Sequence, residues 1–280
     1  MLPVLFRIGE LNIYSYGFML ALGFIVSGYL LRKELKRTGL PVDLADAIVI
    51  AALLGGVFGA KIYSVIEGIV KGEGIIYSVK SFFSGAGLVW YGGFIGGAIA
   101  GILVIRNKKA SIMKALDLLA PLLILGYAFG RMGCFLSGDG DYGPPSDLPW
   151  AMAFPKGTVP TNERVHPTPI YEIILCLIIF AYLWRIRKKI RPAGWMFGVY
   201  LILAAVERFI TEFWRLTAKV FNTITMAQII SVIMVIVGVW LMLRTRNMPI
   251  PVDTPVVEVK KELAKQKTKP KQAKHYKKIR

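Results

Sequence analysis

The stretch DLLAPLLILGYAFGRMGCFLSGD, residues 117–139, decides the fold class of this chain. It belongs to an apolar run over 115–137, and about 20 such residues are enough to cross the hydrocarbon core of a bilayer. Yet it contains Arg131, and a glycine-rich loop that begins with Asp139 follows directly. The pattern predicts a membrane-spanning helix with a permanent charge near one end, and such a charge faces a partner or a polar cavity.

Six further runs of the same kind occur along the chain. Hydrophobic residues make up 55% of the sequence, and a soluble protein this apolar would need amphipathic helices to cover its core, which the sequence lacks. We therefore predict an all-α integral membrane protein with seven transmembrane helices. The seven runs cover 14–31, 44–65, 86–105, 115–137, 169–184, 193–213 and 224–243.

Basic clusters set the orientation of these helices. Lys and Arg residues gather after the first, third, fifth and seventh runs, and such clusters mark the cytoplasmic side of a membrane. The N-terminus is therefore predicted outside and the C-terminus in the cytoplasm. The same placement explains the net charge of +18 without a nucleic-acid partner. The clusters are RKELKR (32–37), RNKK (106–109), RIRKKIR (185–191) and RTR (244–246).

Two parts of the chain are expected to behave differently. Residues 1–246 form the predicted membrane domain, with a long outer loop at 138–168. Residues 247–280 form a basic tail without apolar periodicity, which we predict to be disordered, cytoplasmic and attracted to anionic lipid head groups. A solvated tail without a specific partner is the alternative.

The predicted topology places polar side chains from six helices at one outer depth. We predict that the cations of this cluster outnumber its acids. Such an excess of positive charge is suited to an anionic head group, because arginine binds phosphate through two nitrogens and stays charged. The alternative is an ion-pair network that only holds helices together. The residues are Tyr14, Tyr16, Lys61, Tyr63, Trp90, Tyr91, Arg131, Asp139, His166, Tyr171, Glu172, Glu207, Arg208, Glu212 and Arg215.

Other motifs have simpler interpretations. The stretches 55–65 and 91–101 contain small residues four apart, which favours close helix packing, although Gly92 and Gly93 are also candidates for contact with a head group. With two cysteines and two histidines, no metal site and no cofactor are predicted. Three other possibilities remain open: a nucleophilic Cys134, a transporter with a polar site, and a purely structural membrane protein.

The landmarks of the chain resemble those of the prolipoprotein diacylglyceryl transferases, membrane enzymes of bacteria with seven transmembrane helices and an outer N-terminus. The landmarks follow the order of that family. They are YGFML (16–20), YGGFIGG (91–97), DLLAPLLILGYAFGRMGCFLSGD (117–139), PWAMAFP (149–155), HPTPIYE (166–172) and ERFITEFWR (207–215).

The resemblance implies transfer of the diacylglyceryl group of phosphatidylglycerol to the lipobox cysteine of a prelipoprotein signal peptide, in the inner membrane and toward the outer leaflet. Glycerol phosphate would leave. Arg131 and Arg208 match essential arginines, and Tyr16 and Gly143 match functional positions. Lys61, His166, Glu172, Glu212 and Arg215 are expected to support them.

Four positions depart from the family pattern. Tyr91 replaces a histidine, Cys134 an asparagine, Asp139 a glutamate and Ala204 a tyrosine, and the loop DGDYG is one residue longer. A histidine base at position 91 is thus excluded. Asp139, Tyr91 or a head-group oxygen remain candidates for assisting the thiol. The departures also leave open a divergent member that acts on another lipid or acceptor.

Overall fold

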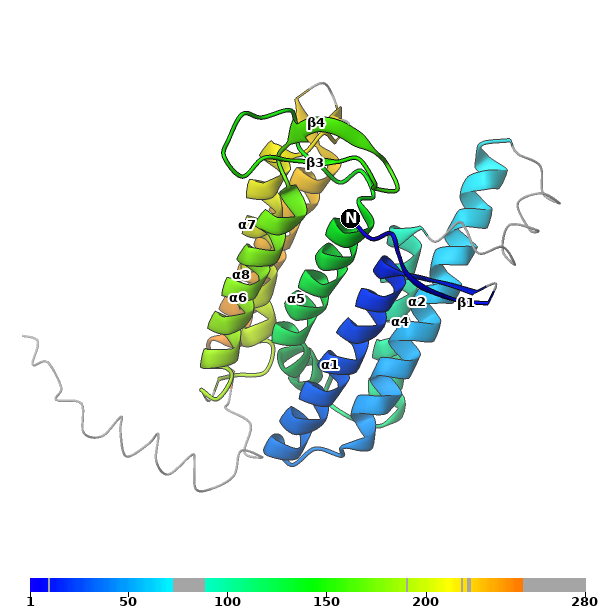
Figure 1. Ribbon diagram of the computed structural model, residues 1–280. Helices are drawn as coiled ribbons and strands as arrows, with labels where there is room; N and C mark the ends of the chain where they lie inside the picture. The colour runs from blue at the N-terminus through cyan, green and yellow to red at the C-terminus, as the bar shows by residue number, and fades with distance from the viewer. Residues whose placement is uncertain (10, 73–88, 190, 218, 221–222, 249–280) are drawn as a thin grey trace, which may run out of the picture.

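The computed structural model describes residues 1–9, 11–72, 89–189, 191–217, 219–220 and 223–248. Its helices lie side by side and form an elongated bundle with two ends (Figure 1). In chain order the elements are β1 (Val4–Ile8), β2 (Leu11–Tyr14), α1 (Ser15–Thr38), α2 (Asp43–Val70), α4 (Trp90–Asn107), α5 (Ile112–Ser137), β3 (Met152–Phe154), β4 (Thr161–Val165), α6 (Thr168–Ile186), α7 (Trp195–Thr211), the 3₁₀ turn η1 (Glu212–Trp214), β5 (Lys219–Val220), β6 (Ile224–Thr225) and α8 (Met226–Thr245).

Each predicted apolar run overlaps one helix, and several helices extend beyond their runs, so the helical part of the prediction is confirmed. By length and composition, α1, α2, α5, α6 and α8 are able to cross a membrane. Helix α4 is apolar over Tyr91–Asn107 but shorter, and α7 has 17 residues. The basic tail lies outside the described residues from 249 onward, as do the first three residues of the run 86–105.

Three short antiparallel hairpins are the part of the fold that the all-α prediction missed: β1–β2, β3–β4 and β5–β6. The second of them organises the long loop. Phe154 is fully buried, stacks on Tyr142 with ring centroids 4.1 Å apart, and meets Phe135 edge to face at 6.1 Å. These aromatic contacts fasten the loop to the last turns of α5.

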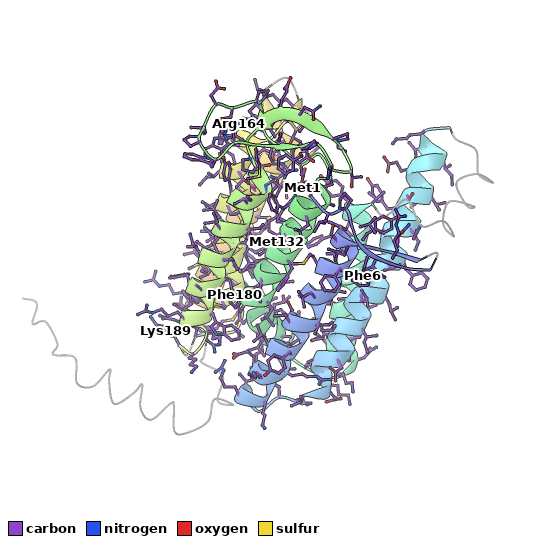
Figure 2. All side chains as sticks on the ribbon, in the orientation of Figure 1. Met1, Phe6, Met132, Arg164, Phe180 and Lys189 are labelled. Atoms are coloured by element: carbon purple, nitrogen blue, oxygen red, sulfur yellow. The ribbon has the colours of Figure 1, made fainter. Side chains whose placement is uncertain are left out.

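The two ends of the bundle differ in character. Arg164, labelled in Figure 2, belongs to the β3–β4 end, whereas Lys189 lies at the opposite end. The last turns of α1, α4, α6 and α8 carry basic residues at that opposite end. We call it the basic end. The interior of this end also holds an ion pair, because Arg187 Nε donates to the buried Glu34 at 2.9 Å.

Helix α5 is the centre of the bundle. Its residues Ala120, Ile124 and Ala128 pack in one apolar core with α6 and α7. Ala115 and Leu122 belong to a second core, shared with α1, α2 and α4. A side chain near the end of α5 can therefore meet groups from either set of helices.

Helices α2 and α4 lie in close contact because glycines face one another. A Cβ atom on Gly59 would meet the carbonyl oxygen of Gly92 and lie 2.9 Å from the Cα of Gly96. A Cβ on Gly92 would meet Gly59 and Tyr63 in return. The close-packing interpretation of the two glycine stretches is confirmed.

This contact predicts a local intolerance of side chains. We expect Gly59→Ala to lower the stability of the protein by roughly 1–3 kcal/mol, since the added carbon is blocked by backbone atoms. Gly101→Ala, on α4, is the matched control because a Cβ there meets no atom within 4 Å. Thermal unfolding in detergent compares the two. A Gly59→Ala midpoint equal to that of the control would show that α2 and α4 do not pack this closely.

Candidate active site

Four segments bring charged residues together at the β3–β4 end. Arg131 lies in the last two turns of α5, Glu172 in the second turn of α6, and Arg208 in the last turn of α7. The loop after α5 turns back over them because Gly138, with φ 60°, ends that helix in the left-handed conformation that favours glycine. The predicted convergence of these residues is therefore found in the structure.

Glu172 is the centre of the cluster. Its side chain is 0% exposed and lies 3.1 Å from Arg131 Nε, 3.3 Å from Arg215 Nη1 and 3.6 Å from Arg208 Nη1. The hydroxyl of Tyr127 donates to Glu172 Oε1 at 3.3 Å. One carboxylate thus holds three guanidinium groups from different segments at one place.

Asp141 is the second bridging acid, and sequence reasoning did not assign it a role. Its two carboxylate oxygens pair with Arg131 Nη1 and Arg215 Nη2. Burial alone would raise the pKa of Asp141, but the guanidinium groups of Arg131 and Arg215 outweigh burial and hold the pKa below its usual value. Asp141 is therefore ionised at neutral pH.

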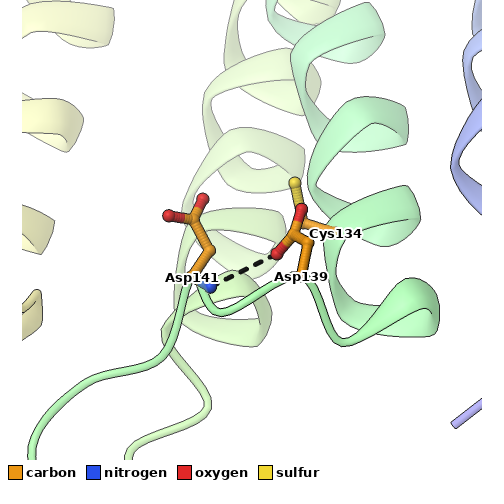
Figure 3. A group of neighbouring side chains, drawn as sticks. All are labelled: Cys134, Asp139 and Asp141. Carbon is orange, nitrogen blue, oxygen red and sulfur yellow. Dashed lines mark hydrogen bonds between the residues drawn. The ribbon is translucent and has the colours of Figure 1, made fainter. Parts of the chain in front are cut away.

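Asp139, the predicted acid, lies nearby but in a different setting. It is exposed, and its Oδ1 accepts a hydrogen bond from the backbone N–H of Asp141 at 3.3 Å (Figure 3). Ligand atoms of Cys134, Asp139 and Asp141 lie within 4.8 Å of one another. Because both Asp141 oxygens already serve arginines, this grouping is better explained as part of the ion-pair cluster than as a metal site.

Arg208, Glu212 and Arg215 do not lie on one continuous α-helix. The α-helix ends at Thr211, η1 follows, and Arg215 is extended with φ −110° and ψ 148°. The residues still meet: Arg208 Nη2 lies 2.6 Å and Arg215 Nε 3.8 Å from Glu212 Oε2. Several buried atoms here have no hydrogen-bond partner in the described part of the chain. They are Glu207 Oε1, Arg208 Nη1, Glu212 Oε1 and Arg215 Nε, while Glu212 Oε2 has, among the described residues, only its ion-pair contacts with Arg208 and Arg215.

The predicted excess of positive charge is wrong for the described residues of this cluster. Three arginines face four acids, Asp141, Glu172, Glu207 and Glu212. The ion-pair network that sequence analysis left as an alternative is thus present. A phosphate can join these arginines only by taking up unpaired N–H groups or by replacing one of the acids.

The predicted residues Lys61, Tyr91, Gly92 and Gly93 lie on α2 and α4, whereas the arginines come from α5, α7 and the segment after η1 (Figure 1). Lys61 is buried and Tyr91 is exposed. A Cβ on Gly93 would lie 3.4 Å from the carbonyl oxygen of Gly56. The contacts of both glycines with α2 favour their packing role, and a head-group role remains a prediction.

Tyr16 and Gly143 lie closer to the cluster. Tyr16, in the first turn of α1, packs against α5, where a Cβ on Gly133 would lie 3.0 Å from Tyr16 Cδ2. Gly143 is enclosed: a Cβ there would meet the carbonyl oxygen of Trp214 and lie 2.6 Å from His166 Cβ. Only glycine fits at position 143 without moving the segment that carries Arg215.

His166 fastens the loop at this position. Its carbonyl oxygen accepts a hydrogen bond from the Gly143 N–H at 2.9 Å, and its Nδ1 lies 3.1 Å from the hydroxyl of Tyr171. Trp150 Nε1 donates to the same hydroxyl at 2.8 Å, which leaves the tyrosine proton for His166 Nδ1. These contacts support the predicted supporting role of His166.

Cys134 is buried one turn after Arg131, and Arg131 Nη1 lies 3.8 Å from its sulfur. We read it as a packing residue. We therefore expect the purified Cys134→Ala protein to retain substantial turnover in the diacylglyceryl transfer that the sequence resemblance implies. A folded Cys134→Ala protein without any activity would instead identify Cys134 as a nucleophile.

Comparison with known proteins gives this geometry a context. Residues 3–244 match the family described as prolipoprotein diacylglyceryl transferase. A phosphatidylglycerol–prolipoprotein diacylglyceryl transferase of Clostridium tetani is 36% identical over 246 residues, which are 86% of this chain and 96% of that protein. The enzyme of the same name from Chromohalobacter salexigens is 31% identical over 255 residues, 89% of this chain and 94% of that protein.

A third relative of that name, from Geobacter sulfurreducens, is 33% identical over 221 residues, 76% of this chain and 82% of that protein. The family match covers all of the helices that form the charged cluster. The chain belongs to the prolipoprotein diacylglyceryl transferase family.

Proposed function

We propose that this protein transfers the diacylglyceryl group of phosphatidylglycerol to the lipobox cysteine thiol of prelipoproteins. The observation that carries the proposal is the gathering of Arg131, Arg208 and Arg215 around Glu172 in a chain of this family. A phosphate ester leaves in this reaction, and preorganised donors stabilise the negative charge that develops on it.

The bond changes follow from the substrates. The thiolate sulfur attacks the glyceryl carbon that carries the phosphate ester, and a C–S bond forms as the C–O bond breaks. The electron pair of that bond goes to the phosphate oxygen, and glycerol phosphate leaves. Arg131 and Arg208 bind this phosphate, and the thiol proton goes to Asp139 or a head-group oxygen, while Tyr91 stays a candidate for assisting the thiol.

The other predicted residues have supporting roles in this proposal. Tyr16, Gly92, Gly93 and Gly143 line the path of the head group, and the residues around the arginines keep them in place. Those around the arginines are His166, Glu172, Glu212 and Arg215, whereas Lys61, on α2, is kept as a predicted supporting residue.

We propose the following placement in the cell. The seven helices cross the bacterial inner membrane with the N-terminus outside, because basic residues gather at the opposite end of the bundle. The active site then opens toward the outer leaflet. Residues 1–246 form the catalytic membrane domain, and 247–280 form a basic cytoplasmic tail.

The test uses purified full-length protein, phosphatidylglycerol and a peptide with a lipobox cysteine. We expect the peptide to gain the mass of one diacylglyceryl group on its cysteine. Phosphatidylethanolamine in place of phosphatidylglycerol should support little transfer. Its ammonium group offsets the charge of its phosphate, so its head group has no net charge to attract the arginines. An unmodified peptide would exclude the function, and equal transfer from both lipids would count against the arginines as an anion site.

A further inference from the structure

The side chain of Asp141 bridges guanidinium nitrogens of two arginines of the cluster. Its carboxylate lies between Arg131 Nη1 and Arg215 Nη2, with one oxygen on each guanidinium group. A phosphate with two oxygens on two arginines has the same arrangement. The contact of Arg131 with Glu172, from Nε at 3.1 Å, does not compete for Nη1.

Of the two acids that bridge the arginines, Asp141 is the one that can leave. Its side chain is 27% exposed, whereas that of Glu172 is 0% exposed. Glu172 is also held by three guanidinium groups and the hydroxyl of Tyr127. Moving Glu172 would break four contacts inside the protein, but a rotation of the Asp141 side chain breaks two at its edge.

Two guanidinium nitrogens of the cluster keep hydrogen-bonding capacity that the acids of the protein do not use. Arg208 Nη1 lies 3.6 Å from Glu172 and Arg215 Nε 3.8 Å from Glu212, too far for a hydrogen bond, and neither buried nitrogen has another hydrogen-bond partner among the described residues. A carboxylate has two oxygens, but a phosphate diester can offer four. The additional oxygens can satisfy donors that Asp141 leaves unpaired, and buried donors gain most from such a partner.

We propose that the carboxylate of Asp141 is a stand-in for the lipid phosphate, which displaces it from Arg131 and Arg215 when phosphatidylglycerol binds. One anion replaces another, so the buried arginines are never left without a counter-charge. After transfer, Asp141 returns to the arginines and favours release of glycerol phosphate. This inference rests on the proposed function and adds a positioning residue that competes with the substrate.

The test compares Asp141→Asn with the wild-type enzyme, using KM for phosphatidylglycerol and the inhibition constant of glycerol phosphate. Asparagine keeps the shape but removes the competing charge. We expect both constants to fall by about tenfold or more, with kcat unchanged or lowered by slow product release. If Asp141 only held the arginines in place, both constants would rise. A rise in the constants, or no change, overturns the exchange.

Two further measurements complete the test. Asp147→Asn removes an exposed carboxylate from the same loop and should leave both constants at wild-type values. Amide hydrogen exchange on the wild-type protein covers the case in which Asp141→Asn does not fold. Glycerol phosphate should increase exchange in the loop 138–143, because Asp141 is released, and reduced exchange there would contradict the proposal.

The two levels of the proposal can fail separately. If the wild-type protein does not modify the lipobox peptide, the proposed function fails. If it does modify the peptide and Asp141→Asn weakens binding, the function stands and only the exchange is wrong.

Discussion

Replacing Arg131 or Arg208 by lysine is expected to lower kcat by about 10²–10³, the usual loss when one preorganised donor to a developing negative charge is removed. Arg131 uses Nε for Glu172 and Nη1 for Asp141, and Arg208 reaches both Glu172 and Glu212. Lysine keeps the charge but lacks the planar fork of fixed N–H donors, so it cannot reproduce the bidentate geometry that holds an acid of the protein and a phosphate oxygen in fixed positions.

The arginine prediction is measured by turnover with phosphatidylglycerol and the lipobox peptide. Arg32→Lys is the control, since Arg32 is exposed at the basic end and pairs with Asp46 there. The midpoint of thermal unfolding should stay close to the wild-type value, although kcat falls strongly. The double variant should lose less than the product of the two single losses, because both arginines serve one phosphate. Normal turnover by either lysine variant would remove that arginine from the mechanism.

The second large effect is expected for Glu172→Gln. Removing one partner of a buried ion pair typically costs about 3–5 kcal/mol, because the other charge stays buried without compensation. Here three guanidinium groups lose a common partner. We expect a marked fall in the thermal midpoint in detergent, together with loss of activity.

Glu163→Gln is the matched control for Glu172→Gln. Glu163 is exposed on β4 at the same end of the molecule, and such surface changes usually stay within about 0.5 kcal/mol. If Glu172→Gln unfolds at the wild-type temperature, the buried carboxylate does not hold the arginines together.

The helices could be predicted closely from the sequence because a membrane demands long, continuous apolar runs. The run 115–137 became α5 at Ile112–Ser137, and 193–213 became α7 at Trp195–Thr211. The convergence of Arg131, Glu172 and Arg208 followed from the same reasoning. It needed only the order of the helices and the side on which each begins.

The side-chain pairing could not be predicted in the same way. Whether Asp139 or Asp141 reaches Arg131 depends on the direction of a loop that passes through Gly138 and Gly140, both with positive φ. The balance of charge was also misjudged, because counting residues along the chain does not show which acids turn inward. The hairpin β3–β4 was missed because its strands are short and lie among glycines and prolines.

The position of the lipid phosphate in an experimental structure of the protein with phosphatidylglycerol tests the central claim most directly. We expect phosphate oxygens about 2.7–2.9 Å from guanidinium nitrogens of Arg131, Arg208 and Arg215, the usual length of such charged hydrogen bonds, with the Asp141 side chain turned away. A phosphate bound elsewhere, with Asp141 still between Arg131 and Arg215, would contradict it.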